Sequence, residues 1–153
     1  MAGLIPTNAG AAIRKGLLSI ACVAFSTVHC LADEKPYAPD SIPGAVIIGA
    51  EQVVELILTK PDLVIIDSRK KSEFAKGHIE GAINLLNTEL TRADLEARIP
   101  DKAAPILFYC NGERCLRSTD SIHKALDWGY RNLFWFRGGW KEWTDKRLPV
   151  ISE

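Results

Sequence analysis

The sequence has no run of like charge, no internal repeat and no low-complexity tract. Its 19 Lys and Arg residues balance 19 Asp and Glu residues, so nucleic acid is not an expected partner. Metal-ligating side chains are also few after position 32, where two cysteines and scattered histidines do not complete the four-ligand set of a zinc site. We therefore expect no metal and no cofactor. The length of 153 residues predicts one globular domain.

Acidic residues are absent from positions 1–32. Within this segment Arg14 and Lys15 precede an apolar run at 16–25, and Cys30-Leu31-Ala32 fits the small-x-small cleavage rule. The pattern predicts a signal peptide at 1–32 and a periplasmic or otherwise exported protein. Three alternatives stay open: an uncleaved anchor, a lipoprotein anchor on Cys22, and a structural helix. The apolar run is shorter than the about 20 residues that a membrane span needs.

Cleavage after Ala32 would leave no membrane span, a small acidic excess of 19 to 17, and only two cysteines. These are Cys110 and Cys115, which share one short loop and would face an oxidising compartment. They could form a disulfide if the turn brings their Cα atoms within about 7 Å of each other.

The remaining chain alternates between strand and helix patterns. A Pro-rich segment at 33–44 is typical of an extended lead-in, and a domain at 45–153 follows. We expect strands at 45–48, 63–66, 82–85, 105–109 and 133–136, and helices at 50–58, 72–76, 91–99, 118–128 and 140–146. This alternation predicts the α/β class, with a parallel sheet and helices on both faces. Asp67, Cys110 and Arg137 follow three of the strands and should meet at one edge, where such sheets bind ligands.

The segment 110–118 joins a buried strand to a helix and contains the residues best suited to chemistry. A helix N-terminus, together with Arg114 and Arg117, stabilises a thiolate and also binds anions. A nucleophilic Cys110 in such a loop suits an oxyanion substrate, namely a thiosulfonate, a phosphate or an arsenate. The other interpretation is a buried, inert Cys110. For Cys115, three interpretations stay open: a plain loop residue, a resolving thiol, or the nucleophile itself.

Three motifs resemble those of the rhodanese-like family, over roughly residues 45–145. The early one runs from Val64-Ile65-Ile66-Asp67-Ser68-Arg69 through Glu73-Phe74 and Gly77-His78-Ile79 to Gly81-Ala82-Ile83-Asn84. The loop Tyr109-Cys110-Asn111-Gly112 with Arg117-Ser118 comes next, and Gly129-Tyr130 and Phe136-Arg137-Gly138-Gly139-Trp140 with Trp143 resemble the closing motif.

The resemblance implies a five-stranded parallel sheet and sulfur transfer, in which a loop cysteine holds a sulfane sulfur as a persulfide. By position, Cys110 would be the nucleophile, a small anionic sulfur donor such as thiosulfate would load it, and a thiol or cyanide-like acceptor would unload it. The implied substrate-binding residues are Asn111, Gly112, Glu113, Arg114, Cys115, Leu116 and Arg117, with Asp67 and Arg69 bordering the pocket.

Structural interpretations compete with several of these roles. Asp67 could simply fix the backbone of its loop, and Arg69 could form a surface pair with Glu73. His78 is expected to be a hydrogen-bonding structural residue, and the four tryptophans are expected to pack in the core.

The active-site loop departs from the family pattern in its length. Six residues separate Cys110 from Arg117, and Cys115 stands where the arginine of single-domain sulfurtransferases would be. A longer loop implies a wider pocket and leaves three alternatives open: a thiol redox or sulfur-carrier module using both cysteines, a phosphatase or arsenate reductase, and a non-catalytic binding domain.

Overall fold

The computed structural model describes residues 36–153 together with Met1 and Gly3. The predicted signal peptide at 1–32 therefore lies almost entirely outside the described residues, and its cleavage stays a prediction. Within the described part of the chain, no helix has the length and apolar character needed to cross a membrane.

Strands and helices alternate along the domain as the sequence pattern predicts. In chain order they are β1 (Ala45–Ile47), α1 (Ala50–Thr59), β2 (Val64–Asp67), α2 (Lys71–Phe74), β3 (Ala82–Asn84), α3 (Arg92–Arg98), β4 (Ile106–Tyr109), α4 (Arg117–Asp127), β5 (Leu133–Phe136) and α5 (Gly139–Asp145). Thr91 caps α3, because its hydroxyl oxygen accepts a hydrogen bond from the Asp94 N–H at 3.2 Å. The bounds differ from the expected ones by only one or two residues.

The five strands form one parallel sheet in the order β1-β5-β4-β2-β3. This confirms the expected five-stranded parallel sheet. β4 is the middle strand, and all four of its side chains are completely buried. A strand covered on both faces must be apolar throughout, which explains the run Ile-Leu-Phe-Tyr.

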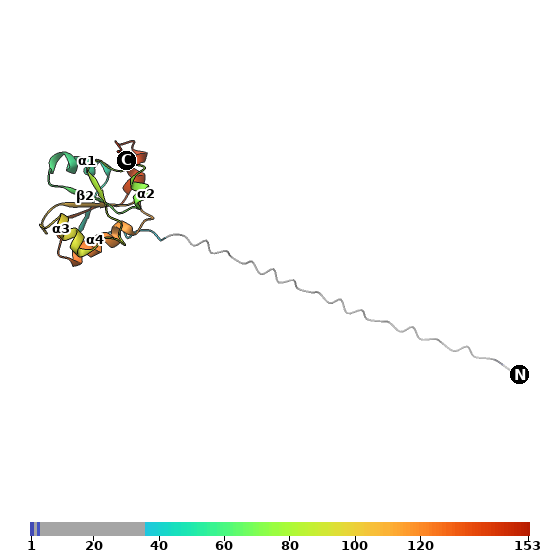
Figure 1. Ribbon diagram of the computed structural model, residues 1–153. Helices are drawn as coiled ribbons and strands as arrows, with labels where there is room; N and C mark the ends of the chain where they lie inside the picture. The colour runs from blue at the N-terminus through green and yellow to red at the C-terminus, as the bar shows by residue number, and fades with distance from the viewer. Residues whose placement is uncertain (2, 4–35) are drawn as a thin grey trace. The chain divides into compact units, whose positions relative to one another are not determined.

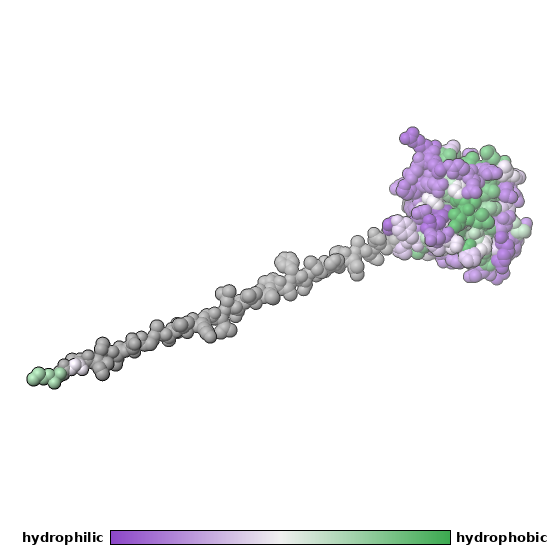
Figure 2. Space-filling model, turned by 180° about the vertical axis from the view of Figure 1, so that it is seen from behind, coloured by the Kyte–Doolittle hydropathy of each residue, from purple (hydrophilic) through white to green (hydrophobic). Residues whose placement is uncertain are grey.

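Helices cover both faces of the sheet (Figure 1). Along β4, Ile106 and Phe108 pack in a cluster with side chains of α3 and α4, whereas Leu107 and Tyr109 pack in a second cluster with side chains of α1 and α5. The alternation follows from the period of two in a strand. The outer surface seen in Figure 2 is largely hydrophilic, with hydrophobic residues gathered in one region of that face.

The lead-in packs against the domain from residue 38 onward. Ala38 and Ile42 belong to the same core cluster as α3 and α4, with exposed fractions of 3% and 2%. The Ala38 N–H also donates a 2.7 Å hydrogen bond to the Glu113 carbonyl, in the loop that follows β4. The lead-in therefore supports the loop that carries both cysteines.

Candidate active site

The carboxyl ends of the three central strands lie at one edge of the sheet. In the register, Asp67 stands beside Tyr109, and Tyr109 beside Phe136. Cys110 and Arg137 come directly after two of these residues, so the structure confirms that they share an edge with Asp67. The chain leaves β2 toward β3 and leaves β4 toward β5, in opposite directions, which is where parallel sheets form ligand sites.

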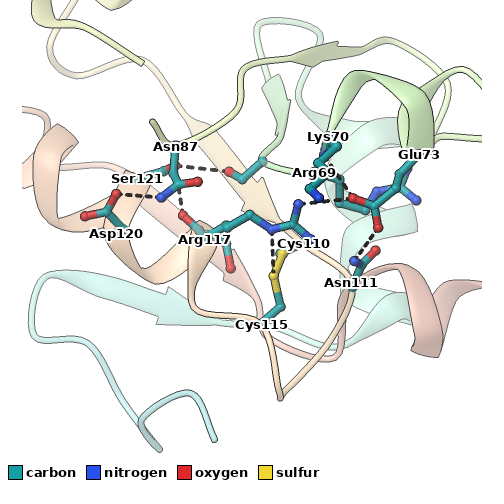
Figure 3. The surroundings of a disulfide bond; sticks show 12 residues. Arg69, Lys70, Glu73, Asn87, Cys110, Asn111, Cys115, Arg117, Asp120 and Ser121 are labelled. Atoms are coloured by element: carbon teal, nitrogen blue, oxygen red, sulfur yellow. Dashed lines mark hydrogen bonds and ion pairs between the residues drawn. A yellow bond between two sulfur atoms is a disulfide. The ribbon is translucent and has the colours of Figure 1, made fainter. Parts of the chain in front are cut away.

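The loop at 110–116 folds back on itself through a turn. The Cys115 N–H donates to the Gly112 carbonyl at 2.9 Å, and Gly112 has a φ of 146°, which favours glycine. The turn brings the Cα atoms of Cys110 and Cys115 to 6.3 Å, and a disulfide joins the two residues (Figure 3). This distance is within the limit of about 7 Å expected for a disulfide.

The two cysteines differ in their access to solvent. Cys110 has an exposed fraction of only 1%, whereas Cys115 is half-buried and borders a cavity of about 900 Å³. The cavity is lined by loop residues 111–117 and by Tyr37, Gly138, Lys141, Glu142 and Asp145. In this disulfide form, Cys115 is therefore the sulfur that a molecule in the cavity meets.

The start of α5 holds the loop at its other side. The N–H groups of Trp140 and Lys141 donate to the carbonyls of Cys110 and Asn111 at 2.8 and 3.0 Å. This approach requires Gly139, which has a φ of 54°, because a Cβ on it would lie 2.3 Å from the Cys110 carbonyl oxygen. Gly139 thus allows α5 to begin directly against the Cys110 carbonyl.

Glu73 is a site residue that the sequence interpretation missed. Its carboxylate accepts hydrogen bonds from the Asn111 side chain at 2.6 Å and from Arg117 Nη1 at 3.1 Å (Figure 3). Partial burial acts to raise the pKa of Glu73, but the hydrogen bonds from Asn111, Lys70 and Arg117 outweigh it and hold that pKa below its usual value. Its position in the early motif could have marked Glu73 as a site residue. The sequence around Glu73 does not show, however, that its carboxylate contacts the loop that follows β4.

Arg117 and Arg114 both line the cavity, as expected for residues of an anion site. Arg117 Nε lies 3.3 Å from Cys115 Sγ, so the guanidinium faces a cysteine sulfur as well as Glu73 (Figure 3). Arg114 lies over the ring of Tyr37, with 4.2 Å to the ring centroid, and Nη2 donates to the Tyr37 hydroxyl at 2.8 Å.

Comparison with known proteins assigns the domain. The family model described as "Rhodanese-like domain" matches residues 49–146. The chain belongs to the rhodanese-like family. The Escherichia coli protein YibN is 27% identical over 139 residues, covering 90% of this chain and 92% of that protein. The Haemophilus influenzae thiosulfate sulfurtransferase GlpE is 26% identical over 87 residues, covering 57% of this chain and 78% of that protein.

A solved structure agrees with this family at the level of the fold. The Anabaena protein Alr3790 superposes with a TM-score of 0.62 at 20% identity, covering 69% of this chain and 82% of that chain. At such an identity the likeness describes the arrangement of strands and helices.

In this rhodanese-like domain, Asp67 and Arg69 are buried and do not line the cavity that they were expected to border. Arg69 Nη2 donates to Asp67 Oδ2 at 2.6 Å and to the Gly77 carbonyl at 2.7 Å, with exposed fractions of 2% and 0% for the two ionised side chains. The interpretation of Arg69 as a surface partner of Glu73 is wrong, because Arg69 is buried against Asp67. Asp67 does fix its own loop, since Oδ1 accepts the Arg69 N–H at 2.8 Å.

The buried pair also involves Tyr109, whose hydroxyl donates to Asp67 Oδ2 at 2.6 Å. Burial, and then the nearby charge of Asp67, raise the pKa of Tyr109, so the phenol stays protonated. For Arg69, burial acts to lower the pKa, but the hydrogen bond with Asp67, the charge of Asp67 and the interaction with Tyr109 together outweigh it, and the pKa is raised. This network anchors the end of β4 directly before Cys110.

His78 and two of the tryptophans have the structural roles expected of them. The His78 ring stacks on Phe74 at 3.7 Å, and Nδ1 donates to the Phe74 carbonyl at 3.0 Å. Trp135 and Trp143 are buried, and their indole N–H groups donate to Ser118 Oγ and the Pro149 carbonyl. Within the described residues no group of three or more His, Cys, Asp or Glu side chains could hold a metal ion; that no metal is needed stays a prediction.

Arg137 lies outside the cavity lining and joins the loop to the lead-in. Nη1 donates to Glu113 at 2.7 Å, and Nε and Nη2 donate to the carbonyls of Pro39 and Ala38, both at 2.9 Å. Arg137 therefore positions the loop.

Proposed function

We propose that this rhodanese-like protein is a sulfurtransferase in which reduced Cys110 accepts a sulfane sulfur from a small anionic donor and passes it to a thiol or cyanide-like acceptor. The single observation that carries the proposal is the position of Cys110. It directly follows the central strand at the carboxyl edge of the sheet and begins a loop whose arginines border a cavity. The similarity to the thiosulfate sulfurtransferase GlpE supports the same activity.

The proposed reaction has two displacement steps. The Cys110 thiolate attacks the outer sulfur of thiosulfate, the sulfur–sulfur bond breaks, and sulfite leaves with the electron pair, so that Cys110 carries a persulfide. The acceptor then attacks the outer sulfur of the persulfide, and the Cys110 thiolate is regenerated. A dithiol must first reduce the Cys110–Cys115 disulfide, because neither sulfur is a nucleophile in that form.

Charge around the cavity suits a small anion that is held loosely. Arg114, Arg117 and Lys141 line the cavity, and three acidic residues line it as well. All three acids are already engaged: Glu113 pairs with Arg137, Asp145 pairs with Lys141, and Glu142 accepts the Ala50 N–H at 2.9 Å. Arg117, held by Glu73 and close to a cysteine sulfur, is the cation we assign to the donor.

We propose that the protein acts after export, because residues 1–32 carry the signal pattern described above. Intact-mass measurement of the protein recovered from the exported fraction should give a chain that begins at Asp33. A chain recovered whole from the cytoplasm would overturn this part of the proposal.

The test is thiosulfate-to-cyanide sulfur transfer by residues 33–153 after reduction with a dithiol. Cys110→Ser should abolish thiocyanate formation, because the serine hydroxyl cannot carry sulfur. Cys115→Ser is the matched control, with the same change in the same loop, and should still form thiocyanate. If Cys110→Ser retained transfer, or if only Cys115→Ser lost it, Cys110 would not be the nucleophile.

The disulfide favours a second candidate function, a thiol redox module that uses Cys110 and Cys115 together. In this role an external thiolate attacks Cys115, the accessible sulfur, and Cys110 leaves as the thiolate. Intact mass of the protein alkylated at the moment of harvest distinguishes the states. Two alkylated thiols in every molecule would exclude the redox role.

A further inference from the structure

We propose that Cys115 discharges the persulfide of Cys110 within the loop, so that the protein releases sulfide without an external acceptor. This inference rests on the proposed function of Cys110 and adds a second activity to it, the reductive cleavage of a sulfane sulfur. The disulfide seen in the structure is then the product state of that step.

The step balances in atoms and electrons. The Cys115 thiolate attacks the inner sulfur of the persulfide, which is Cys110 Sγ. The bond between the inner and outer sulfur breaks, and the outer sulfur leaves with the electron pair and takes up one proton from water to become hydrosulfide. The two cysteines are oxidised to the disulfide by two electrons, and the sulfane sulfur is reduced by the same two electrons.

The fold already holds the two cysteines close enough for this attack. The loop already accommodates a bond between the two sulfur atoms, at a Cα–Cα distance of 6.3 Å. The hydrogen bond from the Cys115 N–H to the Gly112 carbonyl closes the turn that brings the residues together. A thiolate at Cys115 is therefore within bonding reach of the inner sulfur whenever the persulfide forms.

Proximity favours the internal route. In the disulfide form Cys110 has an exposed fraction of 1%, and Cys115, which borders the cavity, is bonded to its Sγ, so Cys115 is the thiol best placed to reach the inner sulfur, whereas an acceptor for transfer needs only the outer sulfur. Release of sulfide requires attack on the inner sulfur, and Cys115 is placed for it. The distinction between inner and outer sulfur thus separates the internal reaction from transfer to an acceptor.

Arg117 provides the charge that Cys115 needs. Its Nε lies 3.3 Å from Cys115 Sγ, and its Nη1 is held by Glu73 at 3.1 Å (Figure 3). A guanidinium in this position favours the thiolate over the thiol, and the thiolate is the attacking form. Cys115 stands only two residues before Arg117, so the end of the loop carries both the thiol and its cation.

A complete cycle requires a dithiol reductant. Reduction of the disulfide restores both thiols, so thiosulfate and a dithiol give sulfite, hydrosulfide and the oxidised dithiol. The cavity of about 900 Å³ beside Cys115 gives a reductant access to the accessible sulfur of the disulfide.

The experiment is a single turnover without cyanide. Reduced residues 33–153, freed of reductant, are mixed with one equivalent of thiosulfate. Released sulfide is measured, and intact mass is recorded over time. We expect the native protein to release sulfide and to lose the mass of two hydrogen atoms. Cys115→Ser should instead gain the mass of one sulfur atom, keep it, and release no sulfide above the protein-free mixture.

Each outcome separates the two proposals. A persulfide that persists equally in the native protein and in Cys115→Ser overturns the internal discharge and leaves sulfur transfer intact. No persulfide in either protein, with no thiocyanate when cyanide is added, overturns the proposed function and the discharge with it. Because the native protein alone shows whether sulfide and disulfide appear together, the test holds even if Cys115→Ser folds poorly.

Discussion

Replacing Gly139 by alanine should destabilise the domain and displace the cysteine loop. Gly139 has a φ of 54°, and an added Cβ would lie 2.3 Å from the carbonyl oxygen of Cys110 and 3.0 Å from the Gly112 nitrogen. Both neighbours are backbone atoms, so no side-chain rotation relieves the contact. Either the start of α5 or the loop must move, and the hydrogen bonds from Trp140 and Lys141 to the loop carbonyls then break.

The magnitude follows from two contributions. A left-handed φ costs a residue other than glycine about 1–2 kcal/mol. Two lost backbone hydrogen bonds cost about 1 kcal/mol each. The free energy of unfolding should therefore fall by about 3–4 kcal/mol, which lowers the Tm of a domain of this size by roughly 10–15 °C. Restoring an ordinary 3.4 Å contact from 2.3 Å requires a shift of about 1 Å at Cys110, enough to cost about a hundredfold in sulfur transfer.

Gly81→Ala is the matched control. Gly81 also has a positive φ, of 77°, but an added Cβ there meets nothing within 4 Å. This variant should lose only about 1–2 kcal/mol and keep its transfer rate. Thermal denaturation and thiocyanate formation are measured on both variants in reduced form. If Gly139→Ala is no less stable than Gly81→Ala and transfers sulfur as fast, the close approach of α5 does not position Cys110.

Two further predictions concern the side chains beneath and beside the loop. Arg69→Met leaves the Asp67 carboxylate buried without its ion-pair partner and should lower the free energy of unfolding, measured by urea denaturation, by about 3–5 kcal/mol. The double variant Arg69→Met with Asp67→Asn should recover part of that loss. Equal stability of the single and the double variant would contradict this reasoning. Because the pKa of Glu73 is lowered in the folded protein, its contribution to stability is present above its ordinary value of 4.5 and is lost as the pH falls through the folded pKa. Urea denaturation below pH 4.5 should therefore show a shallower loss of stability in Glu73→Gln than in the native protein, and parallel curves would contradict it.

The order and type of the elements could be read from local patterns. Apolar runs such as 105–109 alternate with amphipathic segments, and hydrophobic burial acts on such runs wherever they lie in the chain. Capping at Thr91 was predictable for a similar reason, since its partner Asp94 is only three residues away. The shared edge of Asp67, Cys110 and Arg137 followed because parallel strands all end at one side of the sheet.

Contacts between distant residues could not be read in this way. The sheet order β1-β5-β4-β2-β3 decides that α5 begins against Cys110 and that Glu73 meets Asn111 and Arg117. For the same reason Arg69, expected as a surface residue or a neighbour of the pocket, is buried between Asp67 and Trp140. The i,i+4 rule pairs Arg69 with Glu73 only if both lie on an exposed helix surface. It does not predict that Asp67 is buried and binds Arg69 instead.

The sequence by itself therefore determined the class of fold and the place of the cysteine loop at the carboxyl edge of the sheet, because these depend on local composition and on the side of the sheet where parallel strands end. Only the tertiary structure decided the relation between the two cysteines. The turn at Gly112 joins them in a disulfide, and packing buries Cys110 while leaving Cys115 on the cavity wall beside Arg117. A backbone turn and a burial pattern of this kind depend on how α5 and the lead-in pack against the loop, from opposite ends of the domain.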